Sequence, residues 1–209
     1  MVTGNAWVRL RPTLSARLFV MSATGIMAIA GCSSAARTPP PTSRSTDIPF
    51  AWFSASPAPT GWKTMDLADG NGVLSIPPDA RAAENDPGSV SATVISSTGE
   101  LRIYLNATPQ QGDESLDNWN TFRLDHLTDE NSSSPTKFSA RTGMAFRGGT
   151  GSCVDDSYVT HIDNNRYREI ACFVVGSRGG SVLIAAAPAE SWPLYAPVLE
   201  RAVNSYQAR

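Results

Sequence analysis

The stretches RYREIACFVVG at residues 166–176 and VLIAAA at residues 182–187 decide the fold class of this chain. The first mixes polar residues with β-branched and aromatic ones and ends at Gly176, which is typical of a strand. The second is uniformly apolar, so we expect it to lie near the centre of a sheet. A sheet is therefore the core that the rest of the chain must cover.

Further strands are predicted outward from this pair. Leu101, Ile103 and Leu105 share one face of residues 101–107, while the alternate residues are polar or aromatic, the period-2 pattern of a half-buried strand. We expect this strand to form a hairpin with residues 90–96. The other strand candidates are residues 72–76, 137–147 and 152–162.

Two segments change to helical spacing. Residues 113–127 predict a helix, with Asp113 and Glu114 in its first turn and the tract 128–135 ending it. Residues 191–208 predict a closing helix. Its expected buried stripe is Leu194, Val198, Leu199, Ala202, Val203 and Tyr206. This order predicts an α+β domain, an antiparallel sheet with helices packed against it.

The opening Gly61-Trp62 and the run Leu74-Ser75-Ile76-Pro77, with this element order, resemble the PsbP-like α/β/α sandwich over about residues 60–207. That fold also occurs in mycobacterial lipoproteins of the LpqN type. The runs YLNATP at 104–109 and YREIAC at 167–172 are similar to uncharacterised actinobacterial lipoproteins. The resemblance implies a fold and an envelope location, and it brings no established activity.

The N-terminus carries a targeting signal. Three arginines precede an apolar run from Leu18 to Ala30, which describes a secretory signal peptide. The run ends in Ile29-Ala30-Gly31-Cys32, which resembles the bacterial lipobox. We predict a signal peptide over residues 1–31 and a diacylglyceryl anchor, with acyl chains such as palmitate, on Cys32. The mature protein would sit on the extracytoplasmic side of the cell membrane, because two acyl chains suffice for stable anchoring.

A Ser/Pro-rich stretch follows the lipidated cysteine. Residues 32–59 predict a disordered, flexible tether, and residues 60–209 a single globular domain. An apolar segment, Ile48 to Phe53, interrupts the tether. We expect it to dock on the domain surface; the alternative is a segment that binds a partner or touches the membrane.

The charge excludes one class of partner. The chain has 17 basic and 19 acidic residues, and residues 1–31 contain Arg9, Arg11 and Arg17 but no acid. The rest therefore carries 14 basic against 19 acidic groups, a net charge of −5 at neutral pH. An acidic domain without a basic stripe lacks the electrostatic footprint of a nucleic-acid binder. The preference for Arg over Lys is typical of a GC-rich genome such as that of an actinobacterium.

Cys153 and Cys172 remain after lipidation of Cys32. Two cysteines in one exported domain are expected to pair as a disulfide. They lie on neighbouring predicted strands. A tight turn at Asn164-Asn165 would leave them diagonal, whereas a loop centred near Ile162-Asp163 would make them face each other.

Few residues suggest catalysis or metal binding. Asp155-Asp156 could bind Ca²⁺ or act as an acid–base pair, but we expect solvated carboxylates at a strand end. His161 lies on the same predicted strand, about 16–20 Å away if the strand is straight, so it would need a carboxylate from elsewhere, such as Glu169 or Asp125. His126 is the other histidine.

The glycine-rich run 148–152 contains neither a Gly-x-Ser-x-Gly elbow nor a Walker loop, and we expect a flexible turn before a strand. The sequence thus predicts no catalytic residue, no metal site and no cofactor.

The leading interpretation is a membrane-anchored, non-enzymatic binding or scaffold module of the cell envelope. Its partners would be the membrane, through Cys32, and an envelope protein or small ligand. Two alternatives stay open: a small-ligand carrier with a pocket between sheet and helices, and an envelope hydrolase that uses His161 with Asp155 or Asp156.

Overall fold

The computed structural model describes residues 48–129, 132–161 and 163–209. The expected signal peptide, Cys32 and the tether up to residue 47 lie outside these residues. Within the described part, no helix is both long and apolar enough to cross a membrane.

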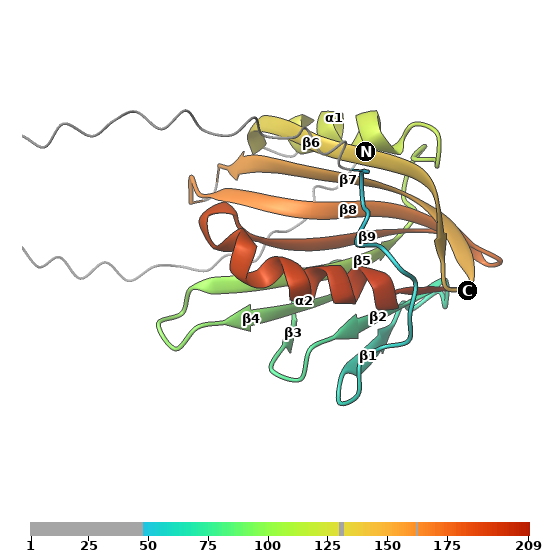
Figure 1. The fold of residues 1–209 in the computed structure, drawn as a ribbon, viewed down its shortest axis with the longest axis horizontal. Coiled ribbons are helices and arrows are strands. Elements are labelled where there is room, and N and C mark those ends of the chain that lie inside the picture. Colours follow the sequence, from blue (N-terminus) through green and yellow to red (C-terminus); the bar gives the residue numbers. More distant parts are fainter. Residues whose placement is uncertain (1–47, 130–131, 162) are drawn as a thin grey trace, which may run out of the picture. The chain divides into compact units, whose positions relative to one another are not determined.

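A seven-stranded antiparallel sheet forms the centre of the domain, in the order β3-β4-β5-β9-β8-β7-β6 (Figure 1). Its strands are β3 (Arg81–Ala83), β4 (Val90–Ile95), β5 (Leu101–Pro109), β6 (Ser132–Phe146), β7 (Gly149–Thr160), β8 (Arg166–Gly176) and β9 (Gly179–Pro188). The apolar strand β9 lies in the middle of the sheet, as expected. Both of its faces are covered there, which explains its uniformly apolar sequence.

One helix packs against each face of this sheet. The core between the sheet and α2 (Trp192–Ser205) contains every second residue of the central strands, such as Ile170 and Cys172. The intervening residues, such as Ala171 and Phe173, pack with Trp119 of α1 (Trp119–Asp129) on the other face. The domain is therefore the α+β sandwich that the sequence predicts.

The sequence did not predict the second, three-stranded sheet, in the order β1-β2-β10. Its strands are β1 (Lys63–Asp66), β2 (Gly72–Ile76) and β10 (Gln207–Ala208). Every residue of β2, the predicted strand 72–76, is buried. The two flanking strands are too short to show a period in the sequence.

The helix α1 begins later than expected. Glu114 does not occupy a first helical turn; its carboxylate accepts hydrogen bonds from the backbone N–H groups of Gln111 and Gly112, both at 2.8 Å. Ser115 and Asn118 exchange side-chain-to-backbone bonds of 2.7 and 3.3 Å. These bonds hold the chain in turns before Trp119, because such side chains compete with helical hydrogen bonding. The tract 128–135 is also not a long break, since α1 runs to Asp129 and β6 starts at Ser132.

The closing helix differs from its prediction at both ends. It is preceded by a short 3₁₀ turn, η1 (Ala189–Ser191), and ends at Ser205. Tyr206 leaves the helix and shares a buried hydrogen bond of 2.6 Å with Ser181. Leu194, expected in the buried stripe, is 69% exposed.

The glycine-rich run is only partly a turn. Gly148 turns the chain between β6 and β7 with φ +75°, and a side chain there would meet the Ala208 carbonyl oxygen at 2.2 Å. The rest of the run, from Gly149 to Ser152, belongs to β7.

The apolar segment 48–53 packs on the domain, as the docking interpretation expects. Phe50 is buried in the α2-side core, and Trp52 and Phe53 pack against it. The Phe53 ring contacts that of Phe146 at a centroid distance of 4.7 Å. Beyond this segment, the backbone N–H of Ser54 donates to the Asn204 side chain of α2 at 2.8 Å. In Figure 1 the segment runs beside α2 across the front of the sheet.

Candidate functional site

The acidic pair Asp155-Asp156 lies inside the domain and is not at a solvated strand end. Both residues belong to β7, and adjacent strand residues point to opposite faces. Asp155 faces α2 and Asp156 faces α1. On strand β8, Arg168 and Glu169 alternate between the same two faces. Glu169 is the register partner of Asp156, and Arg168 is the partner of the residue after it. The expectation of solvated carboxylates is wrong, because neighbouring elements cover both faces of β7 at this level.

On the α2 face, Asp155 forms a bidentate ion pair with Arg168, with N–O distances of 2.9 and 2.7 Å. The Arg168 guanidinium also lies between two aromatic rings. Its central carbon is 4.4 Å from the Phe138 ring centroid and 4.9 Å from that of Trp192. Cation–π contacts and the fork geometry hold this side chain in one place.

On the α1 face, Glu169 pairs with Arg123 of the helix. Nε and Nη2 of Arg123 donate to the two Glu169 oxygens at 2.7 and 3.1 Å. The side chains are 6% and 0% exposed. Burial, the largest single effect, lowers the pKa of Arg123, but the charge of Glu169, the hydrogen bond to it and the nearby Asp156 together raise that pKa above its ordinary value.

Asp156 lies opposite Glu169 in the β7–β8 register and is fully buried. Neither of its carboxylate oxygens has a hydrogen-bond partner among the described residues. Burial, and then the charge of Glu169, raise its pKa to about 9, against the opposing effect of Arg123. Burial and the neighbouring carboxylate therefore favour the neutral, protonated form of Asp156 beside the Arg123–Glu169 ion pair.

Two tyrosines line the same region. Tyr158 is fully buried two residues along β7, and its ring stacks on Tyr167 at 6.3 Å between centroids. Burial and the charge of Glu169 raise its pKa well above the ordinary value. Tyr104 of β5 also has a raised pKa, mainly through burial. Both phenols stay neutral, so Arg123 and Glu169 are the charged groups of the cluster.

The histidines lie apart from this cluster. His161 is exposed in the turn after β7, and Asp125 is exposed on α1. Glu169, the other carboxylate considered for His161, is engaged by Arg123. His126 stacks on Phe122 within α1, at 5.7 Å between ring centroids. The arrangement that a His161 hydrolase would need is not formed by these residues.

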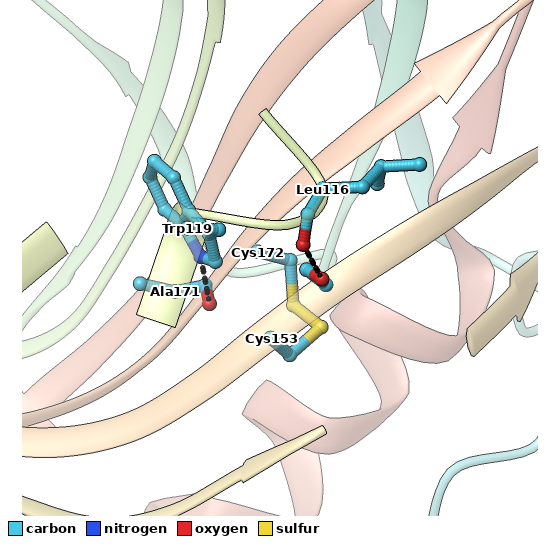
Figure 2. The surroundings of a disulfide bond; sticks show 6 residues. Leu116, Trp119, Cys153, Ala171 and Cys172 are labelled. Atoms are coloured by element: carbon cyan, nitrogen blue, oxygen red, sulfur yellow. Dashed lines mark hydrogen bonds between the residues drawn. A yellow bond between two sulfur atoms is a disulfide. The ribbon is translucent and has the colours of Figure 1, made fainter. Parts of the chain in front are cut away.

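Cys153 and Cys172 form a disulfide in the core between β7 and β8 (Figure 2). The two residues are direct partners in the register, with Cα atoms 4.1 Å apart, so the facing arrangement is the one that forms. The adjacent residues Ser152 and Ala171 face the α1 side of the sheet and bind the segment that contains the start of α1. The Trp119 indole N–H donates to the Ala171 carbonyl at 2.9 Å, and the Ser152 hydroxyl donates to the Leu116 carbonyl.

A separate hollow of about 480 Å³ lies at one end of the sheet. It is lined by Asp79, Arg81, Thr93, Ile95, Ser96 and Ser97. It does not lie between the sheet and a helix, where the carrier alternative places its pocket. The described residues contain no group of three or more His, Cys, Asp or Glu side chains that could hold a metal ion.

Sequence reasoning considered Glu169 as a partner for His161 and not for Arg123. The available signal was the position of Arg123 in the apolar stripe of the predicted helix, together with Trp119 and Leu127. An arginine at a buried helical position requires an acid from the surface it covers.

Comparisons with known proteins support the fold. No protein-family model matches the chain, and no curated protein sequence does. The structure is similar to cyanobacterial PsbP from Synechocystis, with a TM-score of 0.54 and 8% identity over 73% of this chain and 95% of that one. The PsbP-like fold implied by the sequence is thereby confirmed.

Two other solved structures are more distant. One is LpqN of Mycobacterium tuberculosis, described as involved in cell envelope biogenesis (TM-score 0.37, 16% identity, 72% of this chain and 80% of that one). The other is a Pseudomonas aeruginosa protein of unknown function (TM-score 0.47, 12% identity, 71% and 97%). At these identities the likeness concerns the fold alone.

Proposed function

We propose that the protein is a lipoprotein, anchored through Cys32 to the extracytoplasmic face of the cell membrane, whose domain binds an envelope partner without catalysing a reaction. The anchor rests on the basic N-terminus, the apolar run and the sequence Ile29-Ala30-Gly31-Cys32. The absence of a basic stripe argues against a nucleic-acid partner.

The observation that carries the binding role is how the domain uses its reactive side chains. Asp155 and Glu169 are each held in a bidentate ion pair, and Asp156 is sealed from solvent. A general base must be within reach of a substrate proton. Side chains that are engaged in internal ion pairs contribute to a rigid scaffold instead.

A rigid surface patch is the candidate contact region. We define the arginine patch as Phe138, Arg168, Trp192 and Leu194. Phe138, which contacts the Arg168 guanidinium, is 52% exposed, and Leu194, two residues after Trp192 in α2, is 69% exposed. Aromatic and arginine side chains fixed in one conformation are frequent anchors of protein interfaces, because little entropy is lost on binding.

The anchor is tested by the intact mass of the protein extracted from membranes. We expect the wild-type chain to begin at Cys32, to carry the mass of the lipid and to partition into detergent. Cys32→Ala should leave an uncleaved or unlipidated form, whereas Ser33→Ala should behave as the wild type. A mature chain that starts elsewhere and lacks lipid mass would contradict the proposal.

The binding role is tested with a photo-crosslinking residue introduced at Phe138 or at Leu194 in the membrane-bound protein. We expect discrete adducts at both positions. The same residue at Thr98, in the exposed β4–β5 turn, serves as the control. Equal adduct patterns at all three positions would remove the arginine patch as the contact region. Ester or amide hydrolysis that is lost in His161→Ala would favour the hydrolase instead.

A further inference from the structure

Two buried carboxyl groups lie near a single cation, Arg123, beneath α1. Asp156 and Glu169 are directly opposite each other on β7 and β8, and both face the helix. Directly opposite side chains in an antiparallel pair have Cβ atoms about 4.5–5.5 Å apart. Arg123 places both of its hydrogen-bonding nitrogens on Glu169. Asp156 is left beside the Glu169 carboxylate with no donor of its own among the described residues.

This geometry favours the protonated form of Asp156. An ionised carboxylate that is fully buried loses its hydration, and a second carboxylate nearby adds repulsion. The protonated form avoids both costs. The raised pKa of Asp156, to about 9, agrees with this argument from the contacts.

The elements packed around Asp156 carry further ionisable groups, and none of them replaces the missing donor. These groups are Asp155 and Tyr158 on β7, Tyr167 on β8, Lys137 on β6, Arg123, Asp125 and His126 on α1, and Tyr104 on β5. Lys137 is the register partner of Asp156 on β6, but its side chain is exposed. The charge balance of the buried cluster therefore depends on Arg123, Glu169 and Asp156.

The helix α1 is the lid of this cluster. It is held at its start by the bond from Trp119 to Ala171, near its end by the fully buried Leu127, and between them by Arg123. Arg123 is the member of this set that carries a charge. A second negative charge at Asp156 would act directly on the middle attachment.

We propose that a single proton on Asp156 latches α1 onto the sheet, so that α1 docks more tightly as the pH falls and is released more often as the pH rises. Release would uncover the apolar α1 face of the sheet, including Phe173 and Ile184. The device makes the accessibility of that face depend on the pH outside the cell.

The sign follows from proton counting. With α1 released, Asp156 is hydrated and has its ordinary pKa of 3.8; with α1 docked, it keeps its proton up to about pH 9. Between these values the docked state binds one more proton than the released state. The equilibrium constant for opening therefore rises by up to tenfold for each pH unit.

Native-state hydrogen exchange of the whole chain, corrected for the intrinsic pH dependence of amide exchange, measures this opening. Between pH 5 and 8 we expect the opening constant of peptides covering Trp119–Asp129 to rise by up to tenfold per pH unit in the wild type. Asp156→Asn, which has the shape of the protonated acid, should make this constant nearly independent of pH. Peptides from α2 should show no such slope.

Asp155→Asn is the matched control, since it removes the adjacent carboxylate on the other face of β7 and should keep the wild-type slope. A wild-type opening constant that does not change with pH would overturn the latch. So would an equal loss of slope in Asp155→Asn and Asp156→Asn. If α1, β8 and β9 lose protection together, the proton acts on global unfolding and the latch is likewise excluded.

Discussion

Two bidentate ion pairs lie back to back on strands β7 and β8, Asp155 with Arg168 on one face and Glu169 with Arg123 on the other. Their settings differ. The first pair is partly open to solvent, while the second is sealed under α1. A buried pair owes its net stability to the geometry of both partners, because each ion has lost its hydration. Removing one partner therefore matters more under α1 than under α2.

Arg123→Met tests this difference. We expect the free energy of unfolding at pH 7 to fall by about 3–5 kcal/mol, because Glu169 is left as an uncompensated buried charge. Urea denaturation provides the measurement. The double variant Arg123→Met/Glu169→Gln should recover most of the loss, since no buried charge remains. A single-variant loss below about 1 kcal/mol, or no recovery in the double variant, would show that the pair is not buried as described.

Each helix buries one stripe, and the position of that stripe depends on where the helix meets the sheet. α2 starts at Trp192, which is buried in the core beside Arg168, so its first turn already packs on the sheet. Leu194, two residues later, lies about 200° around the helix from Trp192 and therefore faces solvent. Farther along, Leu199, Ala202 and Val203 are fully buried against the central strands. Helical spacing alone relates Leu194 to Val198 but does not show which side of the helix meets the sheet.

The two leucines of α2 provide a matched comparison. We expect Leu199→Ala to lower the free energy of unfolding by about 2–5 kcal/mol, because it removes core contacts and leaves a cavity. Leu194→Ala should change it by less than about 0.5 kcal/mol, as surface substitutions usually do. Chemical denaturation of both variants is the check. Similar losses for the two would contradict the placement of α2 on the sheet.

At the scale of the whole molecule, the ends of the described chain close the domain. Residues 50–53 pack beside α2, and β10 adds to β2 after the helix has crossed the sheet. The disulfide joins the two strands that carry the carboxylates of both ion pairs, across a sequence separation of 19 residues. These links connect segments that lie apart in the sequence.

The disulfide acts on the unfolded chain as much as on the folded one. Closing a loop of this length should stabilise the domain by about 3 kcal/mol in the chain-entropy account. We expect Cys153→Ala/Cys172→Ala to lose about that much in denaturant unfolding. Protein purified from the envelope should yield the linked peptides in non-reducing mapping, whereas reduced cytoplasmic material should not. Free thiols at both positions in envelope protein would refute this.

What the sequence determined by itself is local. Alternation in residues 101–107, the uniformly apolar run 182–187 and the helical spacing of residues 113–127 and 191–208 identified the main strands and both helices, because side-chain periodicity follows backbone geometry. The α+β class and the central place of β9 followed from those patterns. The ends of the helices did not, because capping bonds and the edge of the sheet determine them.

Only the tertiary structure determined which carboxylates are buried and which arginines they pair with. Asp156 looks like any aspartate near a strand end, and its burial depends on α1, which lies elsewhere in the chain. Arg123 and Glu169 are 46 residues apart in the sequence, and they pair because α1 folds back over β8. The second sheet also depends on tertiary structure, because β2 and β10 meet only after α2 has crossed the main sheet. Burial and pairing are properties of surfaces brought together from distant segments, and a one-dimensional pattern carries no information about that meeting.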